Sequence, residues 1–120
     1  MAKVFSLRRK STLALRQRKE TLLRQVSVHP DLLRASVVER FTTCGKGNCS
    51  CRQGQKHGPF YYLTACLAAG RILKYLLKES QEQEQARAGV AHYYQLTEQL
   101  EELSQINAEL LRRGEPLAHR

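Results

Sequence analysis

Hydrophobic residues recur at helical spacing near the beginning of the chain. Strong helix formers dominate from Ser6 to Val28, and Leu15, Leu22 and Val26 lie on one face of the helix they would form. Pro30 follows, and proline interrupts a helix because it lacks the backbone N–H. The pattern predicts a first helix over residues 6–28.

The middle of the chain has the composition of β-strands. The segment SVVERFTTC, residues 36–44, is rich in β-branched residues and predicts a short strand. PFYYLTACL and RILKYLLK then flank AAG, which predicts a β-hairpin that turns at Gly70. RILKYLLKES also contains good helix formers, so this segment could instead begin the next helix.

A long Glu- and Leu-rich segment from Glu79 to Arg113 predicts a C-terminal helix. Gly89 is its only interruption, and Gly114 and Pro116 close it. Apolar residues repeat there at heptad spacing, as in a coiled coil, with one polar residue among them. The residues of this seam are Tyr93, Leu96, Leu100, Leu103, Asn107 and Leu110. Spacing alone leaves open whether the seam contacts a second chain, as a homodimer, or the first helix of the same chain.

Together these patterns predict an α+β protein of small size. It comprises a basic N-terminal helix (residues 1–35), a zinc-stapled β-hairpin and strand module (36–78), a coiled-coil-like acidic helix (79–113) and a short tail (114–120). A chain of 120 residues buries a modest fraction of its surface on folding, so we expect it to need a staple or a partner.

Charge is distributed unevenly along the chain. The formal net charge is +9, and residues 1–60 hold 13 basic side chains against 3 acidic ones. Between Glu79 and Leu111, seven glutamates stand against Arg87 alone. A positive field at one end favours a polyanionic partner, whereas the alternative is that these charges serve only solubility.

We predict that this partner is nucleic acid, DNA before RNA. The expected phosphate contacts are basic residues of the first helix and of the following cysteine-rich segment. They are Arg8, Arg9, Lys10, Arg16, Arg18, Lys19, Arg24, Lys46, Arg52 and Lys56. Tyr62 could add a surface on which a base stacks, whereas strand alternation favours a packing role for Tyr61 and Leu63.

Three cysteines and a histidine lie within fourteen residues. Zinc prefers four thiolate or imidazole ligands, and Cys44, Cys49, Cys51 and His57 supply such a set. Nearby lysines and an arginine would lower the thiol pKa values and offset the negative charge of the site. The spacing predicts a structural Zn²⁺ site, with Cys66 as the alternative fourth ligand to His57.

Other interpretations of the cysteines are less favoured. Cys49 and Cys51 are too close to pair easily, and no secretory signal is expected, which argues against a disulfide. A redox motif would use Cys-x-x-Cys, which is absent. An iron–sulfur cluster could use all four cysteines, but Cys66 is better explained as a small buried strand residue.

The segment VVERFTTCGKGNCSCRQGQKHGPFYYL, with the later LEELSQINAELLRR, resembles an uncharacterised family of small bacterial and archaeal proteins. That family carries a CGK-x2-C-x-C motif followed by HGPYYYL and is known as a domain of unknown function. The resemblance covers Ser36–Arg113, and after Leu63 the sequence departs from the family, whose second hairpin strand is usually basic. Its cysteines, histidine and aromatic run fall on Cys44, Cys49, Cys51, His57, Phe60, Tyr61 and Tyr62. The resemblance implies no established activity and suggests a link to mobile elements.

No catalytic motif stands out in the sequence. His29 and His92 are isolated from any nucleophile or acid, and we expect them to be solvated. We therefore expect a non-enzymatic accessory or regulatory protein, cytoplasmic and without a membrane partner. A transit peptide at the N-terminus is the alternative, but the helical pattern continues past Glu20. An alternative function is a zinc-stabilised adaptor or structural subunit that joins larger protein partners.

Overall fold

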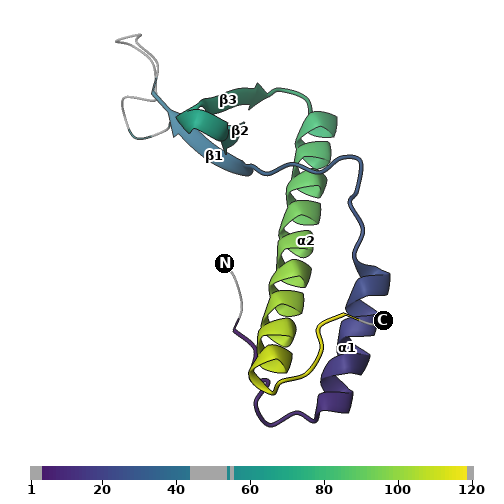
Figure 1. Ribbon diagram of the computed structural model, residues 1–120. Coiled ribbons are helices and arrows are strands. Elements are labelled where there is room, and N and C mark those ends of the chain that lie inside the picture. Colours follow the sequence, from purple (N-terminus) through teal and green to yellow (C-terminus); the bar gives the residue numbers. More distant parts are fainter. Residues whose placement is uncertain (1–3, 44–53, 55, 119–120) are drawn as a thin grey trace. The chain divides into compact units, whose positions relative to one another are not determined.

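The computed structural model describes residues 4–43, 54 and 56–118, and Figure 1 shows the order of their elements. Helix α1 (Thr12–Gln25) is followed by strands β1 (Ser36–Thr42) and β2 (His57–Cys66), a 3-10 turn, strand β3 (Ile72–Leu77) and helix α2 (Ser80–Arg112). The α+β class expected from the sequence is confirmed. The described residues of Met1–His29 and Tyr93–Arg120 form one compact unit, and those of Pro30–His92 form a second.

Helix α1 begins six residues later than the hydrophobic pattern predicts. The side chain of Ser11 accepts a hydrogen bond from the N–H of Ala14, which is the geometry of a helix N-cap. The preceding residues form a turn, in which the N–H of Lys10 donates to the carbonyl of Leu7. The guanidinium of Arg113 donates to the carbonyls of Leu7 and Lys10. These carbonyls therefore accept from a side chain of the C-terminal segment, and not only from backbone N–H groups as in a helix.

The core of the first unit lies between α1 and the C-terminal part of α2. Leu15 and Leu22, expected on one face of α1, are each 1 % exposed. They pack with Leu7, Ile106 and Leu110, and Phe5 and Leu103 border this cluster. The apolar stripe of α1 therefore has a partner within its own chain.

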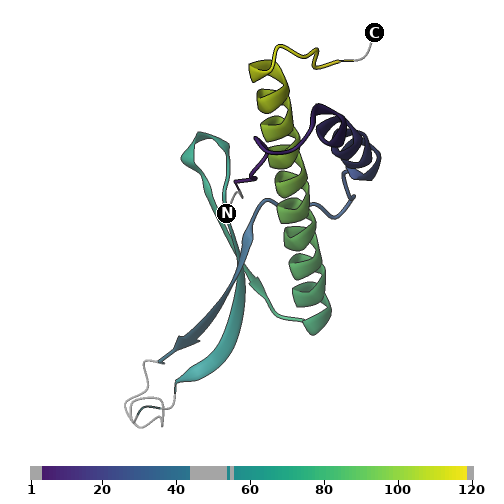
Figure 2. The same cartoon turned by 90° about the horizontal axis from the view of Figure 1, so that it is seen from below.

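The three strands form one antiparallel sheet in the order β1-β2-β3. Figure 2 shows the long twisted strands β1 and β2 side by side. The hairpin between β2 and β3 turns through Ala68–Gly70, as predicted, and Gly70 has a positive φ of 72°. Ile72–Leu77 is a strand rather than the start of the next helix, which resolves the ambiguity of the sequence in this segment.

One face of the sheet forms the core of the second unit. Leu63 and Leu77 are buried with Ala86 of α2, and Leu33, Ala35, Val37, Tyr61 and Val90 pack around them. Residues directly opposite one another in an antiparallel pair share a face, so the pairing of Val37 with Leu63 places both side chains on this core side.

Gly89 allows the chain before β1 to approach α2 closely. The N–H of Leu33 donates to the carbonyl of Gly89 at 3.1 Å. A β-carbon at position 89 would lie 2.3 Å from the carbonyl oxygen of Asp31. The glycine that interrupts the helical pattern is thus required by a contact between the helix and this segment.

Helix α2 starts with a side-chain cap. A carboxylate oxygen of Glu82 accepts from the N–H of Glu79, and the hydroxyl of Tyr75 donates to the other oxygen. These bonds lower the pKa of Glu82, chiefly through the backbone N–H of Glu79, and raise the pKa of Tyr75. Across the described part of the chain, neither helix combines the length and apolarity that a bilayer crossing requires.

Candidate nucleic-acid interface

The sheet face opposite the core carries aromatic and basic side chains. Arg40 of β1 pairs with Phe60 of β2, and Tyr62 lies between Val38 and Leu76 on its two neighbouring strands. Thr64 pairs with Lys74, which continues the same face toward the far end of the hairpin. We call these residues the outer face of the sheet: Ser36, Val38, Arg40, Phe60, Tyr62, Thr64, Lys74 and Leu76.

The outer face contains no acidic side chain. Glu39 is the only acidic residue in the three strands, and it pairs with Tyr61 on the core side. The sequence-based expectation that Tyr61 and Leu63 have packing roles is confirmed, since Leu63 is buried and Tyr61 packs against the core. Strand alternation therefore places Tyr62 alone of these three on the outer face.

Lysine and tyrosine already interact on this face. The ammonium of Lys74 lies 4.6 Å from the centre of the Tyr62 ring. Such a cation over an aromatic ring is attracted by the negative potential of the ring face. Phe60, two residues along β2, is 37 % exposed. The outer face thus combines ring surfaces, which can stack on bases, with cations that can bind phosphate.

Three of the predicted phosphate contacts in α1 have partners within the first unit. Arg18 forms a bidentate pair with Glu102, with N···O distances of 2.6 and 2.8 Å. The hydrogen bonds to this carboxylate raise the pKa of Arg18. Arg16 contacts Glu115 at 3.2 Å. Lys19 donates to the carbonyl of Leu117, and burial, followed by the nearby charge of Arg16, lowers its pKa.

The other cations of this region are available. Arg8, Arg9, Lys10 and Arg24 are exposed, and their side chains form no ion pair or hydrogen bond with any residue that the structure describes. Lys56 is also exposed, whereas Lys46 and Arg52 lie outside the described residues. The sequence gives the number and the positions of the cations, but only the structure separates the paired ones from the others.

The acidic residues near the C-terminus are neutralised internally. Glu109 is buried and binds Arg112 and Arg113 at 2.6 and 2.7 Å. These bonds, first of all those from Arg112, lower the pKa of Glu109 to about 2. Arg113 also donates to Thr12, at the start of α1. The glutamates here serve the fold and do not cancel the charge of the exposed cations.

The predicted zinc site lies largely outside the described residues, which include His57 but not Cys44, Cys49 or Cys51. His57 begins β2 and pairs with Thr42, the last residue of β1. In the sequence, Cys44 follows Thr42 by two residues.

Cys66 stands at the opposite end of β2, where it pairs with Ile72. Nine strand residues at about 3.3 Å each separate it from His57 by roughly 30 Å. Ligands of one zinc ion lie within a few ångströms of one another, so His57 and Cys66 in these positions would not bind the same ion. Cys66 is exposed rather than buried, which corrects the sequence-based expectation.

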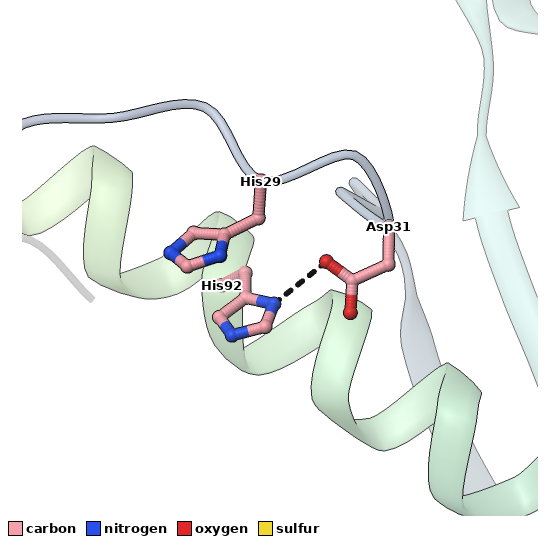
Figure 3. A group of neighbouring side chains, drawn as sticks. All are labelled: His29, Asp31 and His92. Carbon is pink, nitrogen blue, oxygen red and sulfur yellow. Dashed lines mark hydrogen bonds and ion pairs between the residues drawn. The ribbon is translucent and has the colours of Figure 1, made fainter.

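A histidine that the sequence left isolated has an acidic neighbour. Nδ1 of His92, on α2, lies 2.7 Å from a carboxylate oxygen of Asp31, shown by the dashed line in Figure 3. His29 precedes Asp31 by two residues, and the possible ligand atoms of the three lie within 4.8 Å of one another. Imidazole and carboxylate groups can bind a divalent cation. The expectation that both histidines are merely solvated was wrong, because 61 residues separate His92 from Asp31 and only folding brings them together.

The residues of the predicted seam have different environments. Leu110 is fully buried, and Leu103 borders the core that includes Leu15 and Leu22 of the same chain. Leu100 is 48 % exposed. The side-chain oxygen of Asn107 is buried and has no hydrogen-bond partner among the described residues. Part of the seam is therefore used within the chain, while Leu100 remains accessible.

A pocket of about 790 Å³ opens on the core side of the sheet, next to the first turns of α2. Leu33, Leu63 and Leu77 contribute apolar walls, and Glu82 and Glu84 add acidic groups. The second unit thus has acidic groups around an apolar pocket on one side of its sheet and basic groups on the other. Electrostatics would favour a polyanion on the outer face over the pocket.

These features define a class of small α+β proteins with a helical unit and a three-stranded antiparallel sheet that bears a basic, aromatic outer face. Within that class, the chain belongs to the family described as a domain of unknown function, DUF6788, whose model matches residues 12–86. The match begins at the first residue of α1 and includes the whole sheet and the start of α2. Searches of curated proteins and of solved structures find no match.

Proposed function

We propose that this protein is a non-enzymatic nucleic-acid-binding protein that acts in the cytoplasm as an accessory or regulatory factor, on DNA before RNA. The observation that supports this most directly is the charge that remains after the internal ion pairs are taken into account. Arg8, Arg9, Lys10 and Arg24 keep exposed side chains without acidic partners in the part of the chain described here.

Several glutamates of the first unit are already engaged by other arginines. Glu102 binds Arg18 and Glu109 binds Arg112, so neither carboxylate is available to neutralise the exposed cations. Unpaired cations on a folded surface bind phosphates, and the release of condensed counterions then drives the association. The link to mobile elements that the family resemblance suggests is in keeping with work on DNA.

Salt dependence of binding tests this proposal. If roughly five cations per chain contact duplex phosphates, the slope of log affinity against log salt is about −4 to −5. Changing Arg9, Lys10 and Arg24 together to Gln removes three cations that have no partner among the described residues. We expect the magnitude of the slope to fall by about 0.9 for each phosphate that is no longer neutralised, with no change in thermal stability.

A matched variant separates charge from structure. Arg18→Gln also removes one cation, but it breaks the pair with Glu102, so we expect it to lower stability. The proposal would be refuted if the dissociation constants for duplex and for single-stranded nucleic acid both exceeded about 10 μM at roughly 100 mM salt. Non-specific attraction alone approaches that level.

We further propose that Zn²⁺ held by Cys44, Cys49, Cys51 and His57 fixes the segment between β1 and β2. Such a site would supply folding energy and would not need an open coordination position. The pairing of His57 with Thr42 supports this assignment, since it places the histidine at the end of the hairpin to which the cysteine segment connects.

A second candidate function is an adaptor or structural subunit that forms a homodimer through α2. The exposed Leu100 favours it. A second helix could cover this leucine. An adaptor would show no steep salt dependence with nucleic acid, and it would retain a protein partner after nuclease treatment.

A further inference from the structure

The outer face of the sheet presents rings and cations in a fixed order. Strand pairing places Arg40 beside Phe60 at one end, Tyr62 in the middle, and Thr64 beside Lys74 toward the other end. Because the opposite face packs on α2 through Leu63 and its neighbours, the backbone that carries these side chains is held by a core. The strand positions from which the rings project are therefore set before any ligand arrives.

We propose that this face binds single-stranded nucleic acid, with bases stacked on Tyr62 and Phe60 and phosphates bound by Arg40 and Lys74. This inference rests on the proposed nucleic-acid-binding function and specifies its substrate. The choice of a polyanion follows from charge, since the strands carry no acidic residue on this face.

The choice of a single strand follows from the rings. Bases within a duplex already stack on one another, and their flat surfaces are not accessible to a protein side chain. An unpaired strand exposes those surfaces, and base stacking on aromatic residues is tolerant of sequence. Phe60 and Tyr62 are two residues apart on β2 and share a face, so they can receive successive bases.

Lys74 contributes to both the free and the bound state. Without a ligand its ammonium lies over the Tyr62 ring, at 4.6 Å from the centre. A base that stacks on that ring displaces the ammonium, and the flexible four-carbon stem of lysine lets it move to the adjacent phosphate. The pair thus exchanges a cation–π contact for a stacking contact and an ionic one.

The test compares fluorescence anisotropy of a labelled oligo(dT) 12-mer, an oligo(U) 12-mer and a 12-base-pair duplex with the full chain. We expect tighter binding of the single strands than of the duplex. Tyr62→Leu should weaken oligo(dT) binding about 5- to 150-fold and leave the salt slope unchanged, because a stacking contact carries no charge. Lys74→Gln should instead reduce the magnitude of that slope by about 0.7.

Tyr75→Leu is the matched control. Tyr75 is on the core side of the same sheet, is 50 % exposed and donates one hydrogen bond to Glu82, which leucine cannot make. We expect this variant to bind oligo(dT) as the unaltered protein does. Circular dichroism of each variant verifies that the sheet is retained.

The outcomes separate this inference from the general one. Duplex binding that exceeds single-strand binding, or a Tyr62→Leu variant with unchanged affinity and an intact fold, overturns the stacking surface while nucleic-acid binding stands. A lack of binding to all three probes overturns both. An equal loss of affinity for oligo(dT) and oligo(U) in the Tyr62→Leu variant supports a surface that does not distinguish deoxyribose from ribose.

Discussion

Replacing Gly89 by alanine tests the packing of the segment before β1 against α2. In an exposed helix interior, Gly→Ala usually stabilises a protein by up to about 1 kcal/mol, because alanine is the better helix former. Here we expect the opposite sign. The added β-carbon would lie 2.3 Å from the carbonyl oxygen of Asp31 and 3.0 Å from Cδ1 of Leu33.

The magnitude follows from the contacts that must change. Relief of the overlap requires the backbone near Asp31 to move away from the helix, at a cost of about 1–3 kcal/mol for an overpacked site. This movement also strains the 3.1 Å hydrogen bond from Leu33 to Gly89, with a contribution of about 1 kcal/mol. After the gain in helix propensity is subtracted, the free energy of unfolding should fall by about 1–3 kcal/mol.

Urea denaturation followed by far-UV circular dichroism measures this change. Ala88→Gly, at the adjacent exposed position, is the control, and its loss of about 1 kcal/mol should reflect helix propensity alone. If Gly89→Ala raised the denaturation midpoint, the close approach of Asp31 and Leu33 to α2 would be refuted. A loss of stability in both variants supports it, since propensity predicts opposite signs for the two substitutions.

Three other expectations can be measured directly. Metal analysis should find about one zinc per chain, absent from Cys49→Ser and retained in Cys66→Ser; zinc-free protein with an intact fold would contradict the site. Glu109 has a lowered pKa of about 2, so its contribution to stability is present above about pH 4.5 and is lost as the pH falls toward 2. Acid unfolding of Glu109→Gln should therefore depend less on pH across that window, and an unchanged profile would argue against the ion pairs. In light scattering at micromolar concentration, Leu100→Asp should convert a dimer into a folded monomer, whereas Leu110→Asp, which alters a fully buried position, should unfold the chain. A wild-type monomer would contradict association through the exposed part of the seam.

The sequence by itself determined the elements and the faces on which several residues lie. Periodicity identified both helices and the hairpin turn at Gly70, because local spacing reports local structure. Alternation in β2 correctly assigned Leu63 to the core and left Tyr62 for the other side. The start of α1 was predicted too early, since Arg113, about a hundred residues away, binds the carbonyls that precede Ser11.

The tertiary structure alone decided which charged and polar groups have partners. Arg18 and Arg24 look equivalent in the sequence, yet Arg18 binds Glu102, which is 84 residues away, and Arg24 binds no described acid. The pair between Asp31 and His92 likewise joins groups that are 61 residues apart. Composition gives the number of charges, but pairing depends on distances of a few ångströms that only the packing of the chain sets.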